Sequence, residues 1–257
     1  MPELTRPDGC RLYYETHGPR DGEPILLLEG LGGDIPGWRR NIPVLAEELF
    51  VVAFDLRGNG RSDAPREAVT MATFVEDAAA VLHFVGVESG HVYGQSFGGM
   101  IGMELALTHP ERVRSLILAA THPGGSHVTP VRSKVPKDRP WMALYAPGFP
   151  EANPEHVADD LATGAQQPQS RLAARRQWEA MQGFDAYDRL PSIDVPVLVL
   201  HGTEDRLVSV DNARVLAERI PGAELRLIDG AGHLYHSERA AESDAAVLEF
   251  VRRHAGG

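Results

Sequence analysis

A serine lies between two glycines at the point where a strand-like pattern gives way to a helix-like one. Residues 89 to 103 read Ser-Gly-His-Val-Tyr-Gly-Gln-Ser-Phe-Gly-Gly-Met-Ile-Gly-Met, with Ser96 between Gly94 and Gly98. A hydroxyl on a tight strand-to-helix turn stands clear of the backbone, and glycines let the two arms of the turn approach closely. Because so short a pattern also arises in ordinary Gly-rich loops, Ser96 is a candidate nucleophile that needs partners elsewhere in the chain.

Those partners must be a base that takes the serine proton and an acid that orients the base. Downstream of Ser96, the sequence His-Gly-Thr-Glu-Asp ends at Asp205 and the sequence Asp-Gly-Ala-Gly-His ends at His233, each directly after a strand-like run. The order serine, acid, histidine is the one expected after such a turn. The pattern alone does not separate Glu204 from Asp205, and His236 is a second candidate base. A metal site at His233 and His236 has no third ligand nearby in sequence, so we predict no metal.

Short β-branched runs alternate with longer amphipathic segments, which predicts a mostly parallel sheet flanked by helices. The expected parallel strands are Ile25–Leu28, Phe50–Phe54, His91–Tyr93, Val113–Ala119, Val195–Leu200 and Glu224–Ile228. The expected helices are Ile35–Leu49, Met71–Val85, Phe97–Thr108, Val210–Ile220 and Glu242–His254. Glu3–Thr5 and Arg11–Thr16 flank a Pro-Asp-Gly turn and predict an antiparallel hairpin at one edge. The carboxyl ends of parallel strands would bring Ser96, Asp205 and His233 to one edge of the sheet.

The alternation stops between about residues 121 and 190, where a proline-rich stretch precedes helical spacing at Pro154–Thr163 and Ser170–Gln182. We predict one core domain, residues 1–120 and 191–257, with a helical lid inserted at residues 121–190; a linker between two small domains is the alternative. The aromatic side chains of this segment are too apolar for free solvent. They either pack against the core or contact substrate, and the predicted substrate contacts are His122, Trp141, Tyr145, Phe149 and Trp178.

The composition narrows the class of protein. A length of 257 residues suits one large α/β domain, and 36 acidic against 25 basic residues leave a formal charge of -11. Nucleic acid and anionic membranes are therefore not expected as partners. No run approaches the roughly 20 apolar residues of a membrane span, and the N-terminus does not read as a signal peptide. We expect a cytoplasmic monomer or homodimer with a small-molecule substrate.

Over roughly residues 10 to 254 the chain resembles the α/β-hydrolase-fold family. Besides the serine turn, the resemblance rests on Phe-Asp-Leu-Arg-Gly-Asn-Gly-Arg-Ser-Asp at residues 54–63 and on Leu-Thr-His-Pro-Glu-Arg-Val at residues 107–113. It implies a mostly parallel twisted sheet flanked by helices, with an inserted helical lid. It also favours Asp205, three residues after Gly202, as the acid, and His233, in its Gly-Ala-Gly-His context, as the base.

The loop after the third strand departs from the family pattern. Members usually carry His-Gly there, whereas this chain reads Glu-Gly-Leu-Gly-Gly from Glu29. The resemblance implies that the backbone amides of Leu31 and Phe97 form an oxyanion hole and that Gly30 borders the substrate. Glu29 could be a buried structural carboxylate, or it could face the site and disfavour anionic substrates. A Glu29 facing the site should be neutral or ion-paired, because its charge would oppose a developing oxyanion.

The resemblance implies a serine hydrolase that acts without a cofactor or metal on a small, fairly apolar carboxylic ester or lactone, through an acyl-enzyme on Ser96. A carbon–carbon bond hydrolase would use the same three residues and stays open as an alternative. A small-molecule binding or sensing protein with negligible turnover is an alternative from a different class. Dehalogenases and epoxide hydrolases of the family are disfavoured, because they use an aspartate at the position of Ser96.

Overall fold

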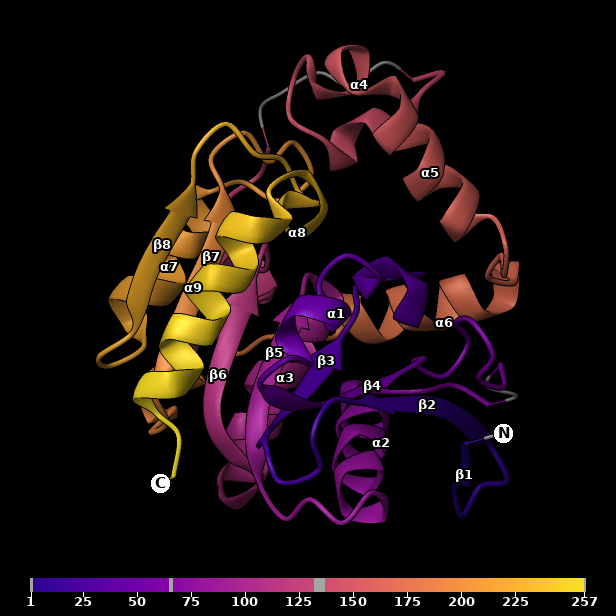
Figure 1. Ribbon diagram of the computed structural model, residues 1–257, viewed down its shortest axis with the longest axis vertical. Coiled ribbons are helices and arrows are strands. Elements are labelled where there is room, and N and C mark those ends of the chain that lie inside the picture. The colour runs from indigo at the N-terminus through magenta and orange to yellow at the C-terminus, as the bar shows by residue number, and fades with distance from the viewer. Residues whose placement is uncertain (1, 65–66, 132–136, 257) are drawn as a thin grey trace.

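The computed structural model describes residues 2–64, 67–131 and 137–256, and its centre is an eight-stranded sheet (Figure 1). The strand order is β1-β2-β4-β3-β5-β6-β7-β8. The strands β3 to β8 pair in parallel, and β1 and β2 add an antiparallel edge. The strands are β1 Glu3–Thr5, β2 Arg11–His17, β3 Glu23–Leu28, β4 Leu49–Phe54, β5 Gly90–Gln95, β6 Val113–Ala119, β7 Val197–Gly202 and β8 Glu224–Ile228. The predicted fold class and the edge hairpin are confirmed.

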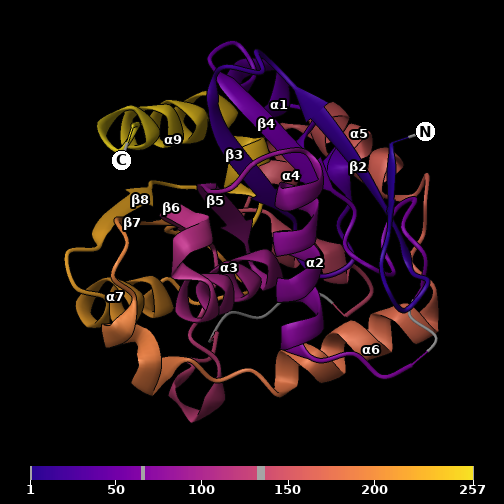
Figure 2. The same cartoon turned by 90° about the horizontal axis from the view of Figure 1, so that it is seen from below.

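Helices cover both faces of the sheet, which explains why its central strands are apolar throughout rather than alternating. In β3, Ile25 and Leu27 face one core cluster while Leu26 and Leu28 face the other, as the two-residue period of a strand requires. One face packs against α2 (Met71–Phe84), α3 (Phe97–Thr108) and α7 (Asp211–Arg219), and the other against α1 (Ile42–Leu45) and α9 (Ala240–Arg253). Figure 2 shows these two layers on either side of the sheet.

Four of the five predicted helices are confirmed within two residues at their starts and ends, but the helix predicted over Ile35–Leu49 is wrong. The structure has a 3₁₀ helix η1 at Ile35–Trp38, then the short α1, and Leu49 already belongs to β4. Pro43 is the physical reason, because a proline inside a continuous helix removes one hydrogen bond and clashes with the preceding turn. At the start of α1 the same proline is tolerated.

Residues 121–190 lie in the connection between β6 and β7, and apart from the isolated bridge between Gly124 and Asp185 their described part consists of helices, turns and irregular segments. The predicted helices are confirmed as α5 Pro154–Gly164 and α6 Arg171–Gln182; Figure 1 shows α4 and α5 at one end of the molecule. Part of the proline-rich stretch, residues 132–136, lies outside the described residues. The other helices of this connection are η3 Gly125–His127, η4 Pro140–Leu144, α4 Phe149–Ala152 and η5 Tyr187–Ser192, which ends just beyond it.

Two short helices complete the fold, η2 Pro110–Arg112 and α8 Tyr235–Glu238. Within the three described ranges, no helix has both the length and the apolar character needed to cross a membrane.

Candidate active site

Ser96 occupies a strained turn between β5 and α3. Its backbone has φ 53° and ψ -112°, a conformation that non-glycine residues rarely adopt. A Cβ atom at Gly94 would collide with the carbonyl oxygen of Gly98, so the two arms of the turn approach as closely as the sequence predicts. The turn is fixed by two hydrogen bonds of 2.7 Å: the Ser96 amide donates to Ala119 O, and Thr121 Oγ1 donates to Ser96 O. Strain of this kind persists where the surrounding structure imposes it, as at many active sites.

Asp205 and His233 form a buried pair at the ends of β7 and β8. His233 Nδ1 lies 2.8 Å from Asp205 Oδ2, and the two residues are 3% and 8% exposed. Glu204 is exposed, so the structure favours Asp205 of the two adjacent carboxylates. The backbone amides of Leu207 and Val208 donate to Asp205 Oδ1 at 2.8 and 2.9 Å. The carboxylate is thus held at both oxygens.

The same contacts fix the charge of Asp205. Burial opposes its ionisation, but His233, His201 and their hydrogen bonds outweigh that effect and hold the pKa of Asp205 well below its usual range. His201 is fully buried, with Nε2 at 3.1 Å from Asp205 Oδ2 and 3.0 Å from Val208 O. The sequence reading assigned His201 no role at the site; its position four residues before Asp205 was the available signal. An ionised Asp205 holds a proton on His233 Nδ1 and leaves Nε2 free to accept one.

The loop after β3 and the first turn of α3 supply two backbone amides without a protein acceptor. Across the described residues, neither the Leu31 nor the Phe97 amide donates a hydrogen bond. Gly30 lies against the serine, since a Cβ atom at Gly30 would come 3.3 Å from Ser96 Cβ. The N-terminus of α3 adds partial positive charge at this position. These amides can therefore stabilise an oxygen that becomes negative beside Ser96.

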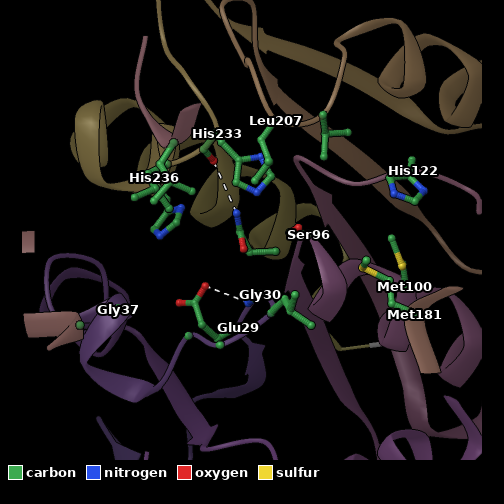
Figure 3. A pocket seen from close by; sticks show the side chains of 18 of the residues that line it. Glu29, Gly30, Gly37, Ser96, Met100, His122, Met181, Leu207, His233 and His236 are labelled. Carbon is green, nitrogen blue, oxygen red and sulfur yellow. Dashed lines mark hydrogen bonds between the residues drawn. The ribbon is translucent and has the colours of Figure 1, made fainter. Parts of the chain in front are cut away.

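Ser96, His233, Gly30 and Leu31 line one cavity of about 790 Å³, and Figure 3 shows Ser96 and His233 on its wall. Of the predicted site residues, Gly30, Leu31, Ser96, His122, Trp178 and His233 line it. Asp205 and Phe97 are not among the lining residues. The structure does not bring the other three predicted contacts, Trp141, Tyr145 and Phe149, to this cavity.

Those three aromatic residues pack on one another instead. Tyr145 stacks on Phe149 with ring centroids 5.8 Å apart, Trp141 meets the Tyr145 ring edge-on, and the Tyr145 hydroxyl donates to Asp160 at 3.1 Å. The alternative interpretation, packing within the fold, therefore describes this group.

The apolar wall of the cavity comes from two methionines and other apolar side chains; the sequence reading missed Met100, whereas Met181 belongs to the apolar residues of the 121–190 segment that it considered for substrate contact. Met100 lies one helical turn after Ser96 on α3, and that four-residue spacing was a readable signal because residues i and i+4 share a helix face. Met181 comes from the end of α6. The remaining apolar lining residues are Val128, Leu144, Phe184, Leu207, Val208 and Leu234.

His122 lines the cavity as a neutral ring. Burial lowers the pKa of His122 to about 4, and its Nδ1 accepts a hydrogen bond from the Gly124 amide at 3.2 Å. Its position directly after β6 is the one that predicted a substrate contact.

Glu29 is both buried and part of the cavity wall, so each of the two expectations for it holds in part. It is 6% exposed, and its Oε1 accepts a hydrogen bond from the Gly30 amide at 2.9 Å. Burial raises the pKa of Glu29 to about 7, the Gly30 amide opposes that shift, and Asp34 adds to it. No cation among the described residues pairs with Glu29.

His236, the second candidate base, lies away from Asp205. Its ring packs 4.9 Å from that of Trp38, and burial lowers the pKa of His236 to about 4. Within the part of the chain described here, no carboxylate hydrogen-bonds to it. The geometry favours His233 as the base.

A buried amide network ties the 121–190 connection to the loop that carries Leu31. Gln177 on α6 is fully buried; its Nε2 donates to Arg57 O at 2.9 Å and to Asn59 Oδ1 at 2.8 Å. Its Oε1 accepts from the Gly32 amide at 3.3 Å. The sequence reading missed this network, because nothing in the α6 pattern separates a buried glutamine from a solvated one.

The described residues contain no group of three or more His, Cys, Asp or Glu side chains that could hold a metal ion.

The fold and site define an α/β hydrolase, and comparisons with known proteins agree. Residues 23–180 and 172–240 match the family described as "alpha/beta hydrolase fold". The chain belongs to this family, and its homologues support a hydrolase enzyme.

A similar protein from Azorhizobium caulinodans, named "Putative carbamate hydrolase RutD", is 35% identical over 256 residues. The match covers 93% of this chain and 94% of that protein. The "3-oxoadipate enol-lactonase 2" of Acinetobacter baylyi is 27% identical and covers 94% of this chain and 93% of its own. The crystal structure of a hydrolase from Pseudomonas aeruginosa PA01 matches with a TM-score of 0.87 and 26% identity, over 97% of both chains.

Proposed function

We propose that the protein is a serine hydrolase that cleaves a small carboxylic ester or lactone through an acyl-enzyme on Ser96. The observation that carries this proposal is the 2.8 Å contact between His233 Nδ1 and Asp205 Oδ2, in a buried pair beside the cavity that holds Ser96. A strained serine, a base with one free ring nitrogen and an ionised acid are the parts that acyl transfer needs.

In the proposed reaction, His233 Nε2 takes the Ser96 proton while Ser96 Oγ attacks the substrate carbonyl. The oxygen that becomes negative binds the Leu31 and Phe97 amides; one such donor typically contributes about 10²- to 10³-fold in rate. His233 then gives its proton to the leaving oxygen, and the carbon–oxygen bond breaks. A water molecule, deprotonated by the same nitrogen, releases the acid and restores the serine.

The cavity and the relatives support a small, partly apolar substrate. The cavity of about 790 Å³ has an apolar side formed by Met100, Met181 and Phe184. Relatives are named as an enol-lactonase, a carbamate hydrolase and, in Ectopseudomonas oleovorans, a "Poly(3-hydroxyalkanoate) depolymerase". Residues 121–190 would act as a lid on the core formed by 1–120 and 191–257, because Trp178, Met181 and Phe184 come from this segment.

The test is mass spectrometry of the intact protein after exposure to a fluorophosphonate, which phosphonylates an activated serine. We expect one adduct, mapped to the peptide that holds Ser96 and absent from the Ser96→Ala variant. The same variant should lose hydrolysis of 4-nitrophenyl butyrate and of γ-lactones while keeping the thermal unfolding of the native protein. An adduct on another serine, or full activity in Ser96→Ala, would refute the assignment.

A further inference from the structure

The cavity has two chemically different ends, with Ser96 between them. Figure 3 shows Met100 and Met181 on one side of the serine and Glu29, Gly37 and His236 on the other. The methionine end is apolar. The opposite end, called the polar end below, is lined by Glu29, Gly37 and His236. Four further lining residues interact with these side chains or with one another: Asp34, Arg39, Asp160 and Ser237.

Two buried polar atoms at the polar end lack a protein partner. Glu29 Oε2 and His236 Nδ1 are buried and have no hydrogen-bond partner among the described residues, so a ligand group in the cavity reaches them when these side chains rotate. The side chains are 6% and 2% exposed. Buried polar groups in folded proteins are almost always hydrogen-bonded, so each exception calls for an explanation. Here both exceptions belong to residues that line the same end of the same cavity.

The backbone leaves room for the Glu29 carboxyl group. A Cβ atom at Gly37 would stand 2.5 Å from Glu29 Oε2, and one at Gly33 would lie within 2.9 Å of Glu29 Cδ. Neither glycine has a positive φ. Glycine is therefore needed at these two positions because a side chain would collide with Glu29, not because of the backbone conformation. The space without side chains holds the Glu29 carboxyl group at the cavity wall.

The electrostatics of the polar end favour a neutral ligand group. Burial raises the pKa of Glu29 to about 7 and lowers that of His236 to about 4, so near pH 6 both side chains are largely neutral. Arg39 is committed to Asp159 and Asp160. A neutral carboxyl group and a neutral imidazole offer both donors and acceptors. An anionic ligand would face Asp34, and Arg39, the cation among the described residues that line this end, is already paired.

We propose that the polar end, centred on Glu29 and His236, is a subsite for a neutral hydrogen-bonding group of the substrate, a hydroxyl or a carboxamide. The methionine end then holds the apolar part of the same molecule. This inference rests on the proposed ester or lactone hydrolysis at Ser96 and adds a substrate class to it: esters with an apolar portion on one side of the carbonyl and a hydroxyl or carboxamide on the other.

Two sets of matched esters test the subsite at pH 6. The first set comprises 4-nitrophenyl esters of four- to six-carbon acids that end in methyl, hydroxyl or carboxamide. The second comprises butyrate esters whose alcohols end in the same three groups. In at least one set we expect the hydroxyl or carboxamide ester to exceed its methyl counterpart in kcat/KM by about tenfold, since an unpaired buried group gains a partner only from the polar ester.

Variants assign this preference to the two side chains. Glu29→Leu and His236→Phe should each reduce the ratio of polar to methyl ester toward one, whereas Glu29→Gln, which keeps a donor and an acceptor, should retain it. Met181→Ala is the matched control at the opposite end and should leave the ratio unchanged. If one of the two apolar variants fails to fold, the other gives the same readout.

The outcomes separate this proposal from the one on which it rests. Absence of labelling at Ser96 and of hydrolysis of every ester would refute the hydrolase itself. Labelling and hydrolysis with no preference in either set, or a preference that survives in both Glu29→Leu and His236→Phe, would overturn the subsite alone.

Discussion

Two loops at the carboxyl edge of the sheet each hold a buried carboxyl group, and the pKa values of the two groups are shifted in opposite directions. After β7, Asp205 accepts two backbone amides and lies within hydrogen-bond distance of two histidines, and its pKa falls below the usual range despite burial. After β3, Glu29 accepts one amide, its other oxygen has no hydrogen-bond partner among the described residues, and burial raises its pKa to about 7. Burial is common to both, so the number of donors decides the charge.

This difference gives the two loops different tasks. A carboxylate whose oxygens are all occupied keeps a fixed charge and, in the proposed reaction, orients His233. A carboxyl group with a free oxygen can change its protonation near neutral pH and can bind something from the cavity. Two results would contradict this difference between the loops: full activity after loss of the Asp205 charge, or an ordinary pKa for Glu29.

The largest effect should follow loss of the Asp205 charge. Asp205→Asn keeps the size of the side chain but removes the charge that holds the His233 tautomer, so kcat for ester hydrolysis should fall by about 10⁴-fold by analogy with other catalytic triads. Glu204→Gln, at the exposed neighbouring carboxylate, should change kcat by less than about twofold. Steady-state kinetics on 4-nitrophenyl butyrate measure both variants; the reverse ranking would make Glu204 the acid.

The contributions of Glu29 and Asp205 to the free energy of unfolding should depend on pH with opposite signs. Between its ordinary pKa of 4.5 and about 7, folded Glu29 holds a proton that the unfolded chain releases, so unfolding becomes easier as pH rises through this window. The shift corresponds to at most about 3 kcal/mol. Asp205, with a lowered pKa, instead adds stability above its ordinary value of 3.8 and loses it as pH falls below that value.

Denaturant unfolding of the wild type and Glu29→Gln at pH 4.5 and pH 8 measures this contribution. Other buried carboxyl groups titrate in the same range, so the wild type should lose stability toward pH 8 and Glu29→Gln should lose less. Equal losses in the two proteins would mean that folding does not raise the pKa of Glu29.

Removal of the support behind the Glu29 loop should affect turnover more than binding. Gln177→Leu keeps the side-chain volume, but it removes the acceptor of the Gly32 amide and one of the two donors to Asn59 Oδ1, so the neighbouring Leu31 amide is held less firmly. We expect kcat to fall about 10- to 100-fold, less than loss of a whole oxyanion donor, with little change in KM. Arg175→Ala on the exposed face of α6 is the control. A rise in KM alone would show that Gln177 shapes the cavity rather than the oxyanion hole.

The sequence was sufficient to predict the sheet and to select Ser96, Asp205 and His233 as candidates, because each of these residues follows a strand and has a short local pattern. It was insufficient where a role depends on contacts between distant segments. The prediction of one helix over Ile35–Leu49 was wrong because Pro43 interrupts it. The aromatic residues Trp141, Tyr145 and Phe149 have the composition of a binding wall but pack on one another. No pattern marks Gln177 as a buried partner, and the four-residue spacing from His201 to Asp205 was a signal that the sequence reading did not use.

The sharpest test of the comparison is the pH dependence of turnover on a neutral ester. When Glu29 ionises, its charge lies beside the proposed oxyanion hole and opposes the negative oxygen of the tetrahedral intermediate. We therefore expect kcat/KM to fall by about tenfold as pH rises through about 7, the pKa of Glu29. The protonated form is the active one, so the fall must lie on the alkaline side.

Glu29→Gln cannot ionise and should show no such fall. Glu238→Gln is the matched control, because burial also raises the pKa of Glu238 to about 7, yet Glu238 is bonded to the Gly232 and Ala146 amides and does not line the cavity. That variant should keep the wild-type profile. The contrary result is that Glu238→Gln abolishes the fall in kcat/KM while Glu29→Gln retains it. That result would mean that the charge of Glu29 does not change near pH 7, and the two loops would then differ only in how their carboxyl groups are packed.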